Sequence, residues 1–307
     1  MAKGHAYKKQ HFLPSFYLKA WVDPVTPLRH VPSIWIFEKD GTGAKRKAPE
    51  KVFAESNMYT IQTPDGGRDL RIERGLQRLE DKFASIRNLK LGRGRPLSNE
   101  DWEYVCAFLA AMHSRTPSTR EHWRKQWERP LRMMDDMAER LKTASPQQIR
   151  SMQSIAPAGG SDSITHDQVK RLVASPLQML MPSLIDTQTP LLASMDMAVV
   201  ETDHPTGFLT SDHPFVLYDT QSHKYPPLFR SPGLLSRTTE ILFPISPTQC
   251  LFLNRQDRRG TMRADANMLT YINQMQVVHA NEKLIACKGK LPSEWLERPA
   301  ERTADDD

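Results

Sequence analysis

The stretch EILFPISPTQCLFL, residues 240–253, decides the fold class of this chain. Its two short runs, EILFPI and QCLFL, are rich in the β-branched and aromatic residues typical of strands, and a proline-containing turn separates them. Similar runs precede it at residues 197–201 (MAVVE), 207–210 (GFLT) and 214–218 (PFVLY). Short strands at this spacing predict an antiparallel β meander.

Upstream of this region the pattern becomes helical. Beginning at Arg68, apolar residues are spaced alternately by four and three positions, which is the stripe of an amphipathic helix. The stripe consists of Ile72, Leu76, Leu79, Phe83 and Ile86. This is the clearest helix in the sequence.

Capping residues mark two further helices. Ser98 and Asp101 form a capping pair for a helix that ends near Arg115, and Thr165 with Gln168 resembles the capping box of another. Prolines set the expected ends, because proline removes a helical hydrogen bond. We expect Pro130 to kink or divide a helix over residues 118–142, and Pro176 and Pro182 to interrupt the helix that follows Thr165.

The two ends of the chain complete the expected fold. In residues 1–60 the sequence SIWIFEKD, residues 33–40, predicts one strand among loops, and residues 264–281 predict a helix before a closing strand at 283–287. The prediction is an α+β fold in which a helical middle segment packs with an antiparallel meander and an N-terminal segment bridges the two. We expect a single domain over residues 1–296, a flexible loop at 156–163 and a disordered tail at 297–307.

Composition limits the class of protein. The longest near-continuous apolar run, residues 105–112, is far shorter than the roughly 20 residues of a membrane span, and the N-terminus lacks the apolar stretch of a secretory signal. Cys106, Cys250 and Cys287 lie in apolar surroundings typical of reduced core thiols. We therefore expect a cytoplasmic protein with no membrane partner, whose net charge of +6 favours polyanions only weakly.

The N-terminal string QHFLPSFYLKAW, residues 10–21, contains the first candidate site residues. Its aromatic residues can anchor Gln10 and His11 to a core, so that His11 becomes a candidate acid, base or ligand. The alternative is a structural histidine that hydrogen-bonds a backbone carbonyl.

The string FLTSDHPFVLY, residues 208–218, places Ser211 and Asp212 where a strand ends. The Asp212 carboxylate could orient an imidazole, accept from an arginine or bind a metal, whereas the alternative is an Asx-turn that caps its own backbone. Asp-His pairs at 203–204 and 212–213 could together hold a divalent metal, but each also makes a good hairpin turn. We therefore predict no metal site.

Two charged pairs lie in the helical part. Glu73 and Glu80 are one heptad apart on the same edge of the apolar stripe, and Arg115 and Arg120 bracket Pro117 at a helix end. Two guanidinium groups there could grip a phosphate or carboxylate, or could simply complement the helix dipole. The sequence has no GxGxxG after a strand and no GxxxxGK[ST], HExxH, CxxC or GxSxG motif, which disfavours the common nucleotide-binding and hydrolase mechanisms.

A series of motifs resembles a bacterial family catalogued as domain of unknown function 4238. The motifs are QHFLPSFYLKAW, SIWIFEKD, MYT (58–60), IERGLQRLEDKF, AFLAAMHSRTPSTR, FLTSDHPFVLY, FPISP and the helix that contains Asn273. The resemblance covers residues 10–287 and implies one contiguous domain. It emphasises His11, Arg115, Ser211, Asp212 and Pro214, together with Asn273, and it brings no established activity.

Two functional hypotheses follow. The first is a metal-free and cofactor-free hydrolase of a phosphodiester, such as RNA, in which His11 is the acid or base, Asp212 orients it and Arg115 stabilises phosphate charge. Its substrate-binding residues would be Gln10, Arg120, Ser211 and Asn273. The alternative is a non-enzymatic binding module for a phosphorylated or carboxylated small molecule or a partner protein. A third reading makes the same residues purely structural.

Overall fold

The computed structural model describes residues 9–26, 30–155, 164–226, 228 and 230–299. The described chain contains eight α-helices. They are α1 (Ser15–Leu18), α2 (Arg71–Leu89), α3 (Asn99–Ser114), α4 (Pro117–Thr143), α5 (Pro146–Ile155), α6 (His166–Ala174), α7 (Pro176–Ala193) and α8 (Ala266–His279). Within these residues, no helix is long and apolar enough to cross a membrane.

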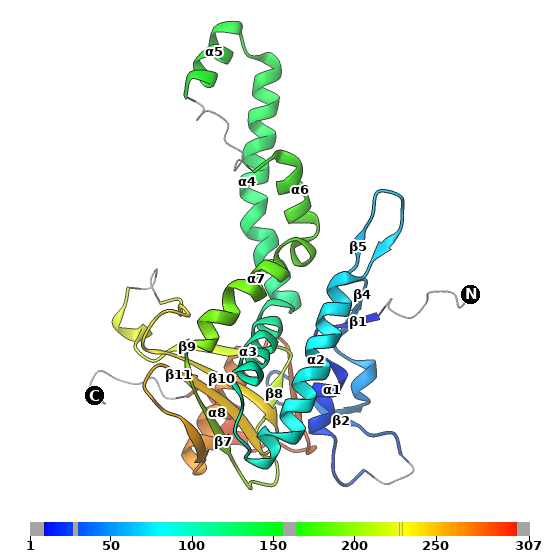
Figure 1. Cartoon of the computed structure of the whole chain (residues 1–307), viewed down its shortest axis with the longest axis vertical. Helices are drawn as coiled ribbons and strands as arrows, with labels where there is room; N and C mark the ends of the chain where they lie inside the picture. The colour runs from blue at the N-terminus through cyan, green and yellow to red at the C-terminus, as the bar shows by residue number, and fades with distance from the viewer. Residues whose placement is uncertain (1–8, 27–29, 156–163, 227, 229, 300–307) are drawn as a thin grey trace.

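A five-stranded sheet lies at the centre of the body (Figure 1), in the order β12-β7-β11-β10-β9. Its strands are β7 (Asp196–Glu201), β9 (Val216–Asp219), β10 (Thr239–Ser246), β11 (Gln249–Asn254) and β12 (Gly260–Arg263). Only β12 runs parallel to its neighbour, β7, and every other pairing is antiparallel. The predicted α+β fold is therefore confirmed.

Both faces of this sheet are buried, which explains the unbroken apolar runs of β10 and β11. Because successive side chains alternate in direction, Phe243 and Leu251 point to a core shared with Phe108 of α3, whereas Leu242 and Phe252 point to a core shared with α8. The sheet thus divides the body into two apolar layers.

A second sheet joins the two ends of the chain. Its order is β3-β2-β13-β8, with β2 (Ile34–Glu38), β3 (Lys45–Lys47), β8 (Thr210–Ser211) and β13 (Lys283–Ala286). Leu284 pairs with Phe37, and α1 is tied to the central sheet by the Tyr17 hydroxyl, which donates to the Pro244 carbonyl at 2.7 Å. The N-terminal segment therefore bridges the two parts, as predicted.

The strand GFLT does not join the predicted meander, because β8 pairs with β13 in the second sheet. Gly207 redirects the chain with φ = +65°, and a Cβ there would lie 1.9 Å from the Pro247 carbonyl oxygen. Only glycine permits this conformation and this close approach without strain.

The N-terminal residues are also more ordered than predicted. Besides β2 and β3, they form β1 (Lys9–His11) paired with β4 (Ala54–Ser56), and a hairpin follows of β5 (Ile61–Gln62) and β6 (Arg68–Asp69). These strands of two or three residues are too short to carry a sequence periodicity. Tertiary pairing therefore creates them.

Pro130 does not divide its helix, and the prediction that Pro182 would interrupt one was wrong. Pro130 lies inside the continuous α4, and Pro182 lies inside α7, while Pro176 begins α7, where a missing N–H removes no helical bond. No residue of α4 is buried, so the carbonyl that Pro130 leaves without a helical donor can face water. In Figure 1, α4 extends away from the body, with α6 packed beside it.

Other predictions have a plain outcome. The capping boxes at Ser98 and Thr165 are both present, α3 ends before Arg115, and the three cysteines are free and buried. The predicted loop at 156–163 and residues 300–307 of the predicted tail lie outside the described residues.

Candidate functional site

Gln10 is buried in β1, and both ends of its side chain are engaged. Its Oε1 accepts from the Tyr59 backbone N–H at 2.6 Å, and its Nε2 donates to the Thr60 hydroxyl at 3.0 Å. The QH and MYT motifs therefore meet each other. The buried amide therefore holds these two segments together.

His11 lies partly buried at the end of the same strand. Its Nε2 is 3.3 Å from the Glu50 carbonyl oxygen, and burial lowers its pKa below the ordinary value of 6.5, so the ring is neutral at pH 7. Its own carbonyl accepts from the Arg115 guanidinium at 2.6 Å. The imidazole thus has the backbone partner that the structural alternative required.

Arg115 is the most buried charged group of the motifs, with 2% of its surface exposed. Its Nη1 donates to Glu80 at 2.8 Å, and its guanidinium lies 5.8 Å from the centre of the Tyr59 ring. Arg120 pairs with Glu55 on β4, with an Nη1–Oε2 distance of 2.5 Å. Each arginine therefore has a carboxylate of its own, and the two do not form an unoccupied fork.

Glu73 is the fifth titratable group of what we call the N-terminal cluster. This cluster consists of His11, Tyr59, Glu73, Glu80 and Arg115. Burial raises the pKa of Glu73, and Arg115 partly offsets that effect. Burial also raises the pKa of Tyr59 to about 12. Several shifted pKa values in one place are typical of functional sites, although structural ion pairs produce them too.

Asp212 belongs to a second group, at the connection between α8 and β13. Its carboxylate accepts from the backbone N–H groups of Asn281 and Glu282, both at 2.8 Å, and of Lys283 at 3.1 Å. Burial raises the pKa of Asp212, and these three bonds oppose the rise. Its recorded partners are thus distant backbone groups, in place of the expected imidazole, arginine or local Asx-turn.

Ser211 and Asn273 complete this C-terminal cluster with Asp212. The Ser211 hydroxyl donates to Gln276 at 3.3 Å and accepts from the His213 N–H at 3.2 Å. The Asn273 side chain accepts from the Leu209 N–H at 2.8 Å and donates to the Gly207 carbonyl at 3.2 Å. The cluster therefore fastens the strand β8 to α8.

The start of α4 is linked to the α8–β13 connection by Ser118, a residue that the sequence analysis did not single out. Its hydroxyl lies 3.5 Å from His213 Nδ1 and accepts from the Asn281 amide at 3.3 Å. Ser118 follows the R-x-P element, whose Arg115 contacts the His11 carbonyl at the end of β1. His11 and Asp212 themselves have different hydrogen-bonding partners. Ser118 could have been noticed as a polar residue at a helix start.

No group of three or more His, Cys, Asp or Glu side chains in the described part of the chain is placed to hold a metal ion. Asp203 of the first Asp-His pair forms an ion pair with Arg263 instead. The residues described thus offer no ready metal centre.

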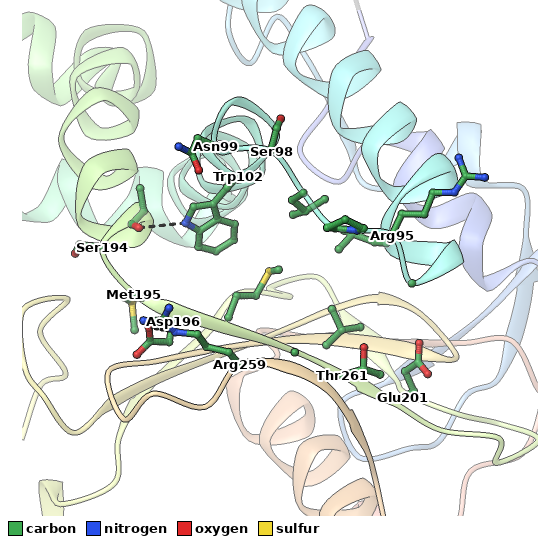
Figure 2. Close-up of a pocket in the computed structure, with 18 residues that line it drawn as sticks. Arg95, Ser98, Asn99, Trp102, Ser194, Met195, Asp196, Glu201, Arg259 and Thr261 are labelled. Atoms are coloured by element: carbon green, nitrogen blue, oxygen red, sulfur yellow. Dashed lines mark hydrogen bonds and ion pairs between the residues drawn. The ribbon is translucent and has the colours of Figure 1, made fainter.

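A cleft of about 760 Å³ lies between the start of α3 and the β7–β12 edge of the central sheet (Figure 2). Three of its polar side chains already have partners. The Trp102 indole donates to the Ala193 carbonyl at 3.1 Å, and Arg259 pairs with Asp196 at 2.6 Å. Trp102, Asp196 and Arg259 are therefore already engaged within the protein.

A neighbouring cleft of about 490 Å³ contains a different kind of group, Arg87. Its Nε donates to Asn88 at 3.2 Å and its Nη2 to the Phe16 carbonyl at 3.4 Å, while its Nη1 is buried and has no partner among the described residues. Burial lowers the pKa of Arg87, and no carboxylate pairs with it in this part of the structure. The sequence showed only an arginine in the last turn of a helix.

Comparison with known proteins identifies a family and nothing further. No curated protein and no solved structure matches the chain. The family model described as "Protein of unknown function (DUF4238)" matches residues 9–290, which span both clusters and both sheets. The chain therefore belongs to this DUF4238 family.

Proposed function

We propose that this protein is a binding module for a phosphorylated or carboxylated small molecule, and that Arg87 grips the anionic group. The supporting observation is the buried Nη1 of Arg87, which has no partner among the described residues and belongs to a residue lining a cleft of about 490 Å³. Burying a polar group without a hydrogen-bond partner lowers the stability of the fold by about 1–3 kcal/mol, and by more when the group is charged. A bound anion would remove that cost.

The other side chains of the cleft suit an anion's oxygens. Thr202, Ser246 and Thr248 contribute hydroxyl groups, and Asn88 contributes an amide whose oxygen already accepts from Arg87. Hydroxyl and amide N–H groups donate to phosphate or carboxylate oxygens, and a planar guanidinium binds them with two N–H groups at once.

Two carboxylates also line the cleft, and each has its own partner. Glu201 accepts from Gln249 Nε2 at 2.9 Å, and Asp203 pairs with Arg263. Neither compensates the charge of Arg87 directly. We therefore place the anion on the side of Arg87, Ser246 and Thr248.

A titration of the purified protein tests this proposal. Pyrophosphate, citrate and adenosine monophosphate are added separately, and heat release and thermal unfolding are measured. We expect at least one of them to bind and raise the unfolding temperature, and Arg87→Gln to weaken that binding by about tenfold or more. Arg78→Gln, an exposed arginine on the same helix, is the matched control. Equal affinity of the wild type and Arg87→Gln would refute the role of Arg87.

A second candidate is the phosphodiester hydrolase predicted from the sequence. The observation that favours it is the N-terminal cluster, in which a neutral His11 and a Glu73 of raised pKa could serve as base and acid. In this version Glu73 is the acid, and Asp212 no longer has the orienting role that the sequence analysis gave it.

Incubation with RNA, DNA and bis(p-nitrophenyl) phosphate, with and without EDTA, separates the two candidates. A hydrolase releases product, and we expect His11→Ala and Glu73→Gln each to slow release by about 100-fold or more, since acid–base catalysis typically contributes 10²–10⁴-fold. A binding module returns every compound chemically unchanged. Intact substrates under all conditions would eliminate the hydrolase while leaving the Arg87 titration unaffected.

Both candidates fit the bacterial cytoplasm, which we propose as the site of action. The three free and buried cysteines are typical of proteins in a reducing compartment. Fractionation of the source cells, with detection by antibody, tests the location.

A further inference from the structure

A third cavity, of about 280 Å³, lies between the central sheet and the first half of α8. Its chemistry differs from that of the Arg87 cleft, because it combines aromatic rings with a carboxylate. The lining residues on which the inference depends are Tyr218, Glu240, Phe252, Arg258 and Tyr271.

Side chains alternate between the two faces of a strand, and this alternation explains why these residues line one cavity. Tyr218 on β9 is the register partner of Glu240 on β10, and Leu242 is the partner of Phe252 on β11. Directly paired residues in antiparallel strands project to the same face, which here is the face covered by α8. Tyr271 reaches the cavity from α8, and its ring centre lies 6.2 Å from that of Tyr218 at an angle of 69°.

Glu240 places a negative charge in these surroundings. Only 7% of its surface is exposed, and one carboxylate oxygen accepts from the Tyr218 hydroxyl. The other oxygen has an ion pair with Arg258 at 4.0 Å, the limit for such a contact, and the Arg258 side chain is 52% exposed. A long pair with an exposed partner contributes little stability, so the Tyr218 hydroxyl is the principal partner of the Glu240 carboxylate and its second oxygen can accept a closer cation.

Arg258 shows that the position accepts a cation. Its guanidinium carbon lies 6.0 Å from the centre of the Phe252 ring as well as near Glu240. Asn254 fixes the backbone of Arg258, accepting from its N–H at 3.2 Å and donating to its carbonyl at 2.9 Å. The side chain can therefore swing out while the loop stays in place.

We propose that this cavity binds a small organic ammonium ion, whose charged head replaces the Arg258 guanidinium beside Glu240. Aromatic rings together with a carboxylate are the groups that recognise alkylated ammonium ions, because the ring faces attract the charge while tolerating its methyl groups. The volume lies just below the roughly 300–1,000 Å³ typical of sites for drug-sized ligands, which restricts the ligand to a small one.

Calorimetric titration with choline tests the proposal, and 3,3-dimethyl-1-butanol serves as the uncharged probe of the same shape. We expect choline to bind at least about tenfold more tightly than the alcohol. Removal of the competing guanidinium in Arg258→Ala should raise choline affinity by about threefold or more, whereas the neighbouring Arg259→Ala, which does not line this cavity, should leave it unchanged.

Two further variants examine the anionic and aromatic parts separately. Glu240→Gln keeps the shape of the side chain and should weaken choline binding by about tenfold, and Tyr271→Leu should weaken it by about fivefold. Equal binding of choline and its uncharged analogue, or no choline binding by either the wild type or Arg258→Ala, would overturn the proposal. Arg87→Gln should leave choline binding unchanged, so failure here is distinguishable from failure of the anion site.

Discussion

The polar side chains of the motif clusters and those of the cavities differ in how completely they are paired. In the motif clusters, Gln10, Arg115 and Asp212 are buried and their side chains have protein partners, and Arg115 has a carboxylate partner in Glu80, although its Nε has no partner among the described residues. In the cavities, Arg87 has no carboxylate partner among the described residues, and Glu240 accepts from the Tyr218 hydroxyl but has only a long ion pair, with a half-exposed arginine.

This difference indicates which residues of this protein are candidates for ligand binding. Buried polar groups that satisfy one another hold the segments of a fold together, and a ligand would first have to break those bonds. Groups left incompletely paired gain free energy when a ligand arrives. The motif residues therefore have the properties of a scaffold, and the cavities have those of binding sites.

The strongest test of this contrast is the removal of Arg115. Arg115→Met leaves Glu80 and the His11 carbonyl without their buried donor, and we expect a loss of about 3–5 kcal/mol in the free energy of unfolding. Urea unfolding measures it. Arg120→Met, whose ion pair is more exposed, is the control and should cost much less. A stable Arg115→Met protein that has lost a catalytic activity would instead make Arg115 a functional residue.

Asp212 offers the next largest effect. Asp212→Ala leaves three backbone N–H groups without an acceptor, so we expect a loss of about 2–4 kcal/mol in unfolding free energy. Asp212→Asn retains one acceptor oxygen and should lose roughly half as much. If both variants unfold at the same urea concentration as the wild type, Asp212 is not part of the scaffold.

The scaffold should also weaken in acid because of His213. Burial lowers its pKa to about 4 in the folded protein, whereas the unfolded chain has an ordinary value of 6.5. The unfolded state thus binds more protons below pH 6.5, and the stability present above that pH is lost as the pH falls towards 4, by about 2–3 kcal/mol. Urea titrations at pH 7 and pH 4.5 measure this loss.

His213→Gln is the control for the acid effect, since glutamine does not titrate. We expect its stability to fall less between pH 7 and pH 4.5 than that of the wild type. Identical pH dependence in the two proteins would show that another group causes the loss, and His113, whose pKa burial also lowers, would be the next to replace.

The smallest effect on stability is expected at Arg87. Arg87→Gln removes a guanidinium that has no carboxylate partner in the described structure, so we expect the free energy of unfolding to change by less than about 1 kcal/mol while anion binding is lost. Thermal unfolding with and without pyrophosphate measures both quantities. A loss as large as that of Arg115→Met would place Arg87 in the scaffold and remove the contrast.

Much of the fold was predictable because local patterns report local structure. Three local patterns correctly predicted helices and strands: the apolar stripe of α2, the capping boxes of α3 and α6, and the apolar runs of β10 and β11. The short strands β1, β4 and β8 were missed or misplaced because two or three residues show no periodicity. Pro130 does not divide α4, because the free-energy cost of a proline inside a helix is smaller where the helix is exposed to water.

The candidate site was predictable only in part. The residues that the motifs emphasise do connect the N-terminal segment, the helices and the strands, but the sequence could not show which side chains had partners. Asp212 illustrates the point, since its three donors lie about 70 residues further along the chain. Arg87 was overlooked for the same reason, because an arginine near a helix end is ordinary until its surroundings are known.

The sequence by itself determined the fold class, the α2 stripe, the helix starts and membership of a family, since these depend on neighbours within a few positions or on motif order. Only the tertiary structure decided that β10 and β11 are buried on both faces, that β8 pairs with β13, and that Arg87 and Glu240 are left incompletely paired. Burial and hydrogen-bond partnership are properties of residues distant in sequence, so they exist only once the chain is packed.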